Sequence, residues 1–390
     1  MTFGFYRGCT GLVFIVLTLH NTTRPAFAAA YTILDLGTLG GNYSEANGIN
    51  ASGQVVGLSE PTPNSVFHAY IASTAKSISP SNDIGTLGGQ FSKAFGINAA
   101  GQVVGQATTI GDATGHAFRT TANGVITVAA DLGTLSTDSH AVSIAYGINA
   151  SGQAIGKSDI GIGSGFHAFR TSAMGKITAD ADLGTLGGKI SEAYGINASG
   201  QTVGNASVIG NVASHAYRTT ATGKINDASD LGTLGGSDST ALGINDLGQV
   251  VGGAAILGDA VRHAFRTTPN GTITLAADLG NLGGTYAAGF SINAIGQTVG
   301  ESWLADNTLH AFFVDKTGPM LDLNSLIDSN SGWVLNQANG INDSGQIVGN
   351  GTINGLPHAY VLTPTPEPAS LSLAVLGGVA LFRRGSRRKS

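Results

Sequence analysis

The feature of this 390-residue chain that most constrains its fold is a set of four short motifs that recurs seven times. A D-[LI]-G-x-L motif is followed by G-I-N, then by G-Q-x-[VI]-G three residues after the Asn, and then by H-A-[FY]. The Asp residues of successive copies are 48, 48, 51, 48, 48 and 44 residues apart, and the last copy, at Asp322, is degraded. Such a period is typical of solenoids and propellers, so we expect the repeats to form one body.

Composition restricts each repeat to strands and tight turns. The chain contains 59 Gly residues, and it is 42% hydrophobic but only 11% charged. A weakly charged, apolar chain can bury enough surface to fold. So many Gly residues argue against long helices, because each costs about 1 kcal/mol relative to Ala inside a helix. We therefore predict an all-β protein with Gly at its turns.

The fourth repeat illustrates the expected unit. A hairpin of two short strands is followed by a third and a fourth strand, each after a further turn. The expected strands are Ala193–Asn197, Gln201–Ala206, His215–Thr219 and Lys224–Leu231. Four short strands in about 48 residues match the dimensions of one propeller blade.

The two ends of the repeated region predict how a ring would close. The region begins with Tyr31–Leu36, a strand of the fourth type, and ends after His358–Leu362, a strand of the third type that lacks its own fourth strand. In a ring, the N-terminal strand would complete the last blade and leave no sheet edge unpaired. We predict a seven-bladed β-propeller over residues 31–363, with an open β-solenoid as the alternative. The only Cys, Cys9, precedes this region, so packing must replace disulfides.

Seven regularly spaced His residues raise the question of a metal site. They are His68, His116, His167, His215, His263, His310 and His358. Zinc needs three or four ligands within about 2.1 Å of one ion, and equivalent positions on successive blades lie farther apart than that. We therefore interpret these residues as structural, each partly buried and hydrogen-bonded to a neighbouring strand or turn.

The repeated Asp and Asn residues are interpreted as turn residues. The Asp before Leu-Gly is expected to accept backbone N–H hydrogen bonds, and the Asn of G-I-N to adopt a positive φ beside Gly. We expect no cofactor. Calcium, with its six to eight oxygen ligands, is the one ion that the Asp residues leave open, although no D-x-D-x-D run is present. The G-x-x-G spacings carry no nucleotide-binding signal, because no long amphipathic helix follows them.

Catalysis usually needs a few unique residues in one place, so an active site would be sought where the repeat is irregular. The irregular segments are Ser59–Phe67, Asp138–His140 and Glu301–Asp306, which contains Trp303. Glu301 and Asp306 could supply the acid and base of a glycosidase, but two polar residues on one loop are also typical of a solvated surface. We predict a non-catalytic protein with no catalytic residues; the alternative is a secreted glycan hydrolase or lyase.

Residues 1–28 have the three parts of a signal peptide. Arg7 is the positive residue, Gly11–Leu19 is the apolar run, and Ala26-Phe27-Ala28 is the cleavage sequence. The apolar run is about half the ~20 residues needed to span a bilayer. We therefore expect export, with cleavage by signal peptidase.

Residues 364–390 have the parts of a sorting tail. Pro366-Glu367-Pro368 precedes the apolar stretch Ala369–Phe382 and an Arg-rich end. The stretch is short for a membrane-spanning helix, but the Arg cluster would hold its end in the cytoplasm. We expect a transient association of this tail with the inner membrane, and a permanent anchor is the alternative.

These two regions resemble known families. The repeated motifs resemble HAF extracellular repeats over residues 31–363, and the tail is similar to the PEP-CTERM sorting signal, with Pro366, Glu367 and Pro368 as its motif. The tail resemblance implies processing by an exosortase in a Gram-negative bacterium that makes extracellular polysaccharide, whereas the HAF resemblance implies no established activity.

These resemblances lead us to expect a surface or biofilm-matrix protein that has exopolysaccharide or another surface component as its ligand. Nucleic acid is not expected as a partner, because the body has 12 basic and 23 acidic residues and a net charge of about −11.

Overall fold

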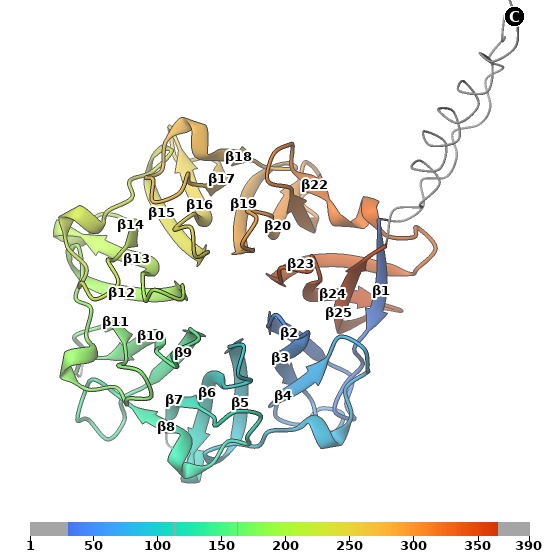
Figure 1. Ribbon diagram of the computed structural model, residues 1–390, viewed down its shortest axis with the longest axis horizontal. Coiled ribbons are helices and arrows are strands. Elements are labelled where there is room, and N and C mark those ends of the chain that lie inside the picture. The colour runs from blue at the N-terminus through green and yellow to red at the C-terminus, as the bar shows by residue number, and fades with distance from the viewer. Residues whose placement is uncertain (1–29, 113, 162, 366–390) are drawn as a thin grey trace, which may run out of the picture.

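The computed structural model describes residues 30–112, 114–161 and 163–365, which form a ring of β-sheets around a central opening (Figure 1). Each of the seven repeats forms one sheet, or blade; a single parallel bridge between Arg262 and Tyr286 links two of the blades. The predicted all-β propeller is confirmed. The signal segment 1–28, the motif Pro366-Glu367-Pro368 and the apolar stretch Ala369–Phe382 lie outside the described residues. Within the described ranges, no helix has the length and apolar character needed to cross a bilayer.

Each blade has three main strands, numbered outward from the opening, and a short fourth strand or bridge at its outer side. Blade 1 contains β2 (Ser44–Ile49), β3 (Gln54–Ser59) and β4 (His68–Ser73). Blade 2 contains β5 (Gly88–Ile97), β6 (Val103–Thr109), β7 (Gly115–Arg119) and β8 (Asp131–Gly133). Blade 3 contains β9 (Ser143–Ile148), β10 (Ala154–Asp159) and β11 (Phe166–Arg170), and blade 4 contains β12 (Gly187–Ile196), β13 (Thr202–Val208) and β14 (Ser214–Arg218).

The remaining blades complete the ring. Blade 5 contains β15 (Gly235–Ile244), β16 (Val250–Ile256), β17 (Arg262–Arg266) and β18 (Asp278–Gly280). Blade 6 contains β19 (Gly283–Ile292), β20 (Thr298–Leu304), β21 (Leu309–Val314) and β22 (Leu321–Asp322). Blade 7 contains β23 (Trp333–Ile341), β24 (Ile347–Ile353), β25 (Leu356–Pro364) and β1 (Tyr31–Asp35).

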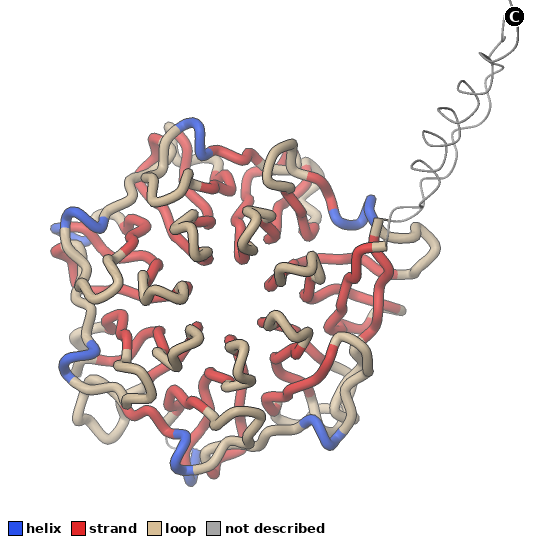
Figure 2. The backbone as a smooth tube through the Cα atoms, viewed as in Figure 1, coloured by secondary structure: helices blue, strands red, loops and turns tan. Residues whose placement is uncertain are grey.

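Short 3-10 helices occupy the connections, and Figure 2 shows helical turns at the outer edge of the ring. In the described residues they are η1 (Pro80–Asn82), η2 (Ile110–Asp112), η3 (Val128–Ala130), η4 (Ala179–Ala181), η5 (Ile209–Asn211), η6 (Asp227–Ser229), η7 (Leu275–Ala277) and η8 (Leu323–Leu326).

The N-terminal strand closes the ring as the sequence predicts. β1 pairs antiparallel with β25, from Tyr31 opposite Pro364 to Asp35 opposite Tyr360 (Figure 1). Beyond the strand, the Leu36 N–H donates to the Ala359 carbonyl at 3.0 Å. The first and last repeats therefore share one blade, and the alternative of an open solenoid is wrong.

The predicted fourth strand over Lys224–Leu231 is wrong. This segment contains η6 instead, and Asp230 alone makes a bridge to β14, opposite Tyr217. The Ile225 N–H bonds to the Leu183 carbonyl at 2.8 Å and not to β14. The Ile225 side chain is buried in the cluster that contains Leu183. This packing and the bond to Leu183 hold the segment where it cannot pair with β14 along its length.

The core lies between neighbouring blades. The aromatic residues of H-A-[FY] are fully buried; they are Tyr70, Phe118, Phe169, Tyr217, Phe265, Phe312 and Tyr360. At the junction of blades 7 and 1, Leu36 packs in one cluster with Val55, Tyr70 and Val361. The closing segment therefore contributes to the core as an internal repeat does.

The last Gly of G-Q-x-[VI]-G is required by a close backbone approach. Each first strand has a β-bulge beside this Gly, as between Ala193, which is opposite Gly204, and Gly195, which is opposite Val203. A Cβ on Gly204 would lie 1.8 Å from the Glu192 carbonyl oxygen, and the other six copies have equivalent approaches of 1.8–2.0 Å. No side chain fits there without moving the backbone.

The ring has two distinct faces. One, the turn face, carries the tight turns between first and second strands; the other, the hairpin face, carries the loops between second and third strands. Both described ends lie on the turn face, where Pro364 lies next to Gly345 in the β23–β24 turn and the Thr365 N–H donates to the Ala30 carbonyl. Thr365, the last described residue, therefore lies on the face opposite the hairpins.

Candidate functional site

The Asn residues of the G-I-N motifs form a closed ring of hydrogen bonds around the opening. Each Nδ2 donates to the backbone carbonyl of the Asn in the next blade at 3.0–3.3 Å. In order, the ring is Asn50, Asn98, Asn149, Asn197, Asn245, Asn293, Asn342 and again Asn50. Each Oδ1 accepts the N–H of the Gln four residues on, at 2.9–3.0 Å. The ring ties every blade to the next.

The predicted positive φ of these Asn residues is wrong. None of the seven has a positive φ, which instead falls on the Gly three residues later, as at Gly53 (78°) and Gly200 (93°). The Asn residues are only 3–5% exposed. They are constrained by their side-chain bonds rather than by the left-handed region.

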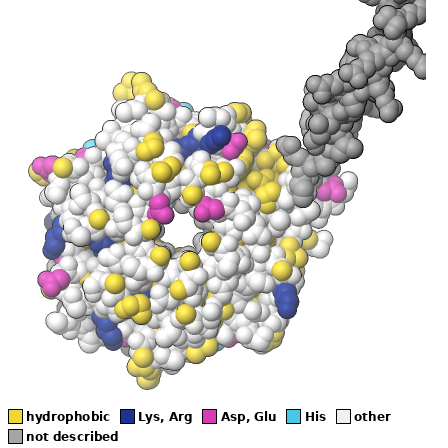
Figure 3. Space-filling view, viewed as in Figure 1, with side chains coloured by type: hydrophobic (Ala, Val, Ile, Leu, Met, Phe, Trp, Pro, Cys, Tyr) yellow, Lys and Arg dark blue, Asp and Glu magenta, His cyan; other side chains and the backbone are white. Residues whose placement is uncertain are grey.

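The first strands line a channel. At the turn face it opens into a cavity of about 300 Å³, lined by the Ile-Asn pairs and by the residue after each Asn. That residue is Ala in five blades and Asp246 or Asp343 in the other two. Figure 3 shows acidic side chains at the rim of the opening. Deeper in the channel, Tyr194, Leu242 and Phe290 are among the residues that line a second cavity of about 200 Å³.

The structure places each of the seven repeated His residues against the Asp of the following D-[LI]-G motif. The shortest distance from His Nδ1 to an Asp carboxylate oxygen is 2.7–3.0 Å in every blade. In blade 7 the pair is His358 with Asp35, so this contact also bridges the ring closure. In six blades the same carboxylate accepts the N–H of the Gly two residues on, at 2.7–2.8 Å, which confirms the predicted turn role of Asp.

The electrostatics of the pair are clearest in blade 1. Burial opposes ionisation of Asp83, but hydrogen bonds from His68 and the Gly85 N–H hold the pKa of its carboxyl below the usual value. The hydrogen bond to Asp83 in turn raises the pKa of His68. The pair is therefore stabilised as an ion pair. Across the ranges that the structure describes, no three His, Cys, Asp or Glu side chains form a group that could hold a metal ion.

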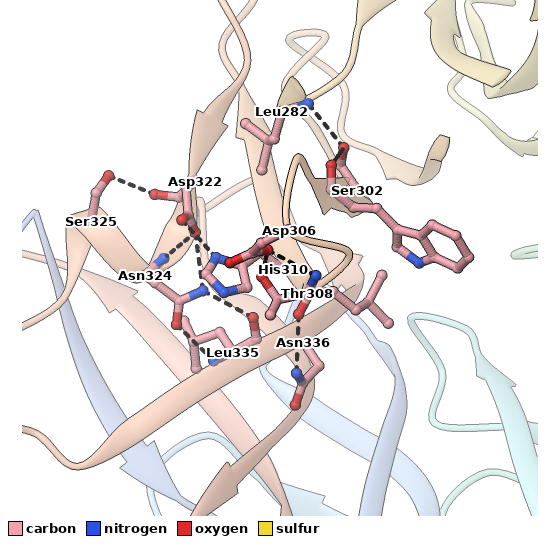
Figure 4. Close-up of polar contacts among 12 residues, drawn as sticks. Leu282, Ser302, Asp306, Thr308, His310, Asp322, Asn324, Ser325, Leu335 and Asn336 are labelled. Carbon is pink, nitrogen blue, oxygen red and sulfur yellow. Dashed lines mark hydrogen bonds and ion pairs between the residues drawn. The ribbon is translucent and has the colours of Figure 1, made fainter. Parts of the chain in front are cut away.

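The candidate glycosidase pair is not brought together. Glu301 lies on β20 and accepts from Gln337 Nε2 of blade 7 at 2.6 Å, and burial raises the pKa of its carboxyl. Asp306 lies beyond the end of β20 and accepts from the Thr308 hydroxyl and N–H at 2.6 and 3.0 Å (Figure 4). The strand ends three residues, or about 10 Å, beyond Glu301. Glu301 is thus held against blade 7 and Asp306 within its own turn, so their hydrogen bonds do not direct the two carboxyl groups to one place, as a glycosidase requires.

The close-up also shows polar contacts near Asp306 (Figure 4). His310 Nδ1 contacts Asp322 at 2.7 Å, and Asp322 also accepts from the Asn324 N–H (Figure 4). Asn324 Oδ1 in turn accepts from the Leu335 N–H at 2.7 Å. The polar groups beside Asp306 are thus used to join blades 6 and 7.

The other irregular segments lie in different blades. In blade 1, Ser59 is fully buried and its hydroxyl bridges the Leu39 N–H and the Tyr43 carbonyl. In blade 3, Asp138 accepts the N–H of His140, whose side chain is 83% exposed. The structure therefore does not combine the three irregular segments into one site.

Sequence reasoning missed a set of Arg residues. They directly follow H-A-[FY] in four repeats and are Arg119, Arg170, Arg218 and Arg266. Each guanidinium donates to a Gly carbonyl in the next blade at 2.5–3.3 Å, and burial lowers its pKa. Their position in the repeat was the available signal, and their bonds to backbone carbonyls make them links between blades.

Comparisons with known proteins add little to this geometry. No protein-family model matches the chain, and no curated protein matches it. Among solved structures, the chain is similar to the BP39L lectin from Burkholderia pseudomallei, with 12% sequence identity and a TM-score of 0.41. The similarity covers 85% of this chain and 99% of the lectin.

Proposed function

We propose that this protein is an exported, non-catalytic protein of the cell surface or extracellular matrix that binds polysaccharide through its hairpin face. The proposal joins the export and sorting features of the sequence, including the resemblance to PEP-CTERM and HAF proteins, to the surface that the blades present. Signal peptidase and an exosortase would process the two ends in a Gram-negative cell.

The observation that carries the proposal is a set of exposed apolar side chains on the hairpin face. Six blades each present at least one; the residues are Val66, Ile110, Ile209, Val212, Leu257, Trp303 and Leu356. Ile209, Val212 and Leu257 are 78–85% exposed. The C–H faces of sugar rings pack on apolar and aromatic side chains, so each of these exposed groups can provide one contact. Repetition around the ring would let weak contacts act together.

The position of the chain ends supports display of this face. Thr365, the last described residue, lies on the turn face. A tail that is attached at the cell surface would therefore leave the hairpin face directed away from the attachment point.

The test is retention of the purified protein on the exopolysaccharide of the producing cells. Leu257→Asp should reduce retention several-fold, because it places a charge on the hairpin face. Leu275→Asp is the matched control: Leu275 is 81% exposed, against 85% for Leu257, but it lies on η7 away from the hairpins. Absence of retention of the unmodified protein would overturn polysaccharide binding, whereas equal effects of the two substitutions would overturn the assignment to the hairpin face.

A further inference from the structure

The mouth of the channel on the turn face carries a ring of equivalent backbone N–H groups. In every blade, the Asn N–H donates to the Gln carbonyl four residues on at 3.0–3.1 Å, and the Gly N–H returns to the Asn carbonyl at 3.0–3.1 Å. The seven turns therefore share one conformation. The residue after each Asn lines the opening in all seven, so its N–H group has the same orientation in each.

Two of these N–H groups already hold a carboxylate. The Ala198 N–H of blade 4 donates to Asp246 Oδ1 of blade 5 at 2.9 Å, and the Ala294 N–H of blade 6 donates to Asp343 Oδ1 of blade 7 at 2.9 Å. In both cases the carboxylate comes from the equivalent position of the next blade. The protein thus shows, with its own side chains, that this N–H position binds a carboxylate oxygen.

Three consecutive blades lack that carboxylate. Ala51, Ala99 and Ala150 occupy the position in blades 1, 2 and 3, and each is followed around the ring by another Ala at that position. Within the described residues, their N–H groups have no hydrogen-bond partner, and all three residues are exposed. Asp246 and Asp343 belong to blades 5 and 7 and bind the N–H groups of blades 4 and 6, so blades 1–3 form an arc of free donors without an acidic side chain at this position.

We propose that this arc, the N–H groups of Ala51, Ala99 and Ala150, is a binding site for the carboxylate of an external ligand such as a sugar acid. The ligand takes the place that Asp246 and Asp343 fill elsewhere in the ring. Exposed backbone N–H groups of turns are an established form of anion site, and each N–H of the arc offers one donor, as the Ala198 and Ala294 N–H groups do to Asp246 and Asp343. The site is independent of the proposed polysaccharide contact, because it lies on the opposite face.

The test is an NMR titration of the ¹⁵N-labelled protein with glucuronate, acetate and glucose. Glucuronate should move the Ala51, Ala99 and Ala150 amide signals in a saturable way, and glucose should not. A response to acetate as well would show that the carboxylate alone suffices, whereas a response to glucuronate only would identify a sugar acid as the ligand class. No response to either acid, or an equal response to glucose, would overturn the proposal.

Substitutions at Ala150 and Ala100 distinguish the effect of covering an N–H group of the site from the effect of an added negative charge. Ala150→Asp should cover the Ala99 N–H as Asp246 covers that of Ala198, and weaken glucuronate binding about tenfold or more, the worth of one hydrogen bond to a charged group. Ala150→Asn supplies a neutral oxygen and should also weaken binding. Ala100→Asp adds the same charge at an exposed turn residue that does not line the cavity, and should have little effect.

The outcomes of these variants are decisive in both directions. Loss of binding with Ala150→Asp but not with Ala150→Asn would mean that repulsion alone acts, and would overturn the proposal. Asp246→Ala makes the opposite change, because it removes a carboxylate instead of adding one. It uncovers the Ala198 N–H, whose amide signal should then respond to glucuronate as those of Ala51, Ala99 and Ala150 do. A silent Ala198 signal in that variant would count against the site.

Discussion

Closure of the ring by the N-terminal segment makes a quantitative prediction about Leu36. Leu36 is fully buried between blades 7 and 1, and its internal counterpart Leu231 is 3% exposed in the equivalent cluster of blades 4 and 5. Replacing either Leu by Ala removes three carbons, worth about 2.4 kcal/mol at about 0.8 kcal/mol each. The cavity left behind raises the cost to about 3–4 kcal/mol. We therefore expect Leu36→Ala and Leu231→Ala to lower the free energy of unfolding by similar amounts.

Urea unfolding can compare the two variants directly. The described residues include Trp303 in blade 6 and Trp333 in blade 7, so fluorescence follows the blades next to the closure, and circular dichroism follows all strands. Hydrogen exchange at the Leu36 N–H, bonded to the Ala359 carbonyl, reports on the closing segment itself. Suppose that Leu36→Ala lowers the free energy of unfolding by less than about 1 kcal/mol while Leu231→Ala lowers it by the expected amount. The closing segment would then unfold locally without loss of the ring, and the prediction that it packs like an internal repeat would be refuted.

Three further predictions concern the repeated polar and Gly positions. Asn197→Ala should cost about 2–3 kcal/mol of unfolding free energy, because it leaves the Asn245 carbonyl and the Gln201 N–H without their bonds; a urea titration beside the exposed control Thr222→Ala, expected within about 0.5 kcal/mol, would show this. Gly204→Ala should cost about 3 kcal/mol or more in the same assay, since its Cβ would overlap the Glu192 carbonyl; a near-neutral result would contradict the close approach. Because the pKa of His68 is raised in the fold, its stabilising effect is complete below about pH 6.5 and is lost as the pH rises through the folded-state pKa. Urea midpoints measured across that range should fall in the parent and fall less in His68→Gln; identical profiles would rule out this contribution.

The ring architecture was predictable because it is encoded in repetition rather than in any single residue. The missing fourth strand of the last repeat and the extra strand at Tyr31 together specified the closure, and β1 pairs with β25 as expected. The turn role of Asp could also be predicted, because an Asp before Leu-Gly has few other backbone donors within reach.

The positions that failed depend on contacts between repeats. Lys224–Leu231 reads as a strand on its own, but Ile225 is held by Leu183 of the preceding blade, which no local pattern reveals. The Asn residues were assigned a turn conformation from their neighbours in sequence. Their actual constraint is a bond to the next Asn, 48 to 51 residues away and, at the closure between Asn342 and Asn50, 292 residues away.

The proposed carboxylate site was harder still to predict, because its donors are backbone groups and any residue supplies an N–H. What distinguishes blades 1–3 is the absence of an acidic side chain that blades 5 and 7 possess. In the sequence this difference is only Ala against Asp after G-I-N or S-I-N, a change that looks like ordinary drift in a repeat. It acquires a meaning once the structure shows that Asp246 and Asp343 point back to the preceding blade. In a repeat protein, a binding site can thus arise where one repeat lacks a hydrogen bond that another repeat makes with its own side chain. Such a site is found by comparing the hydrogen bonds at equivalent positions of the repeats.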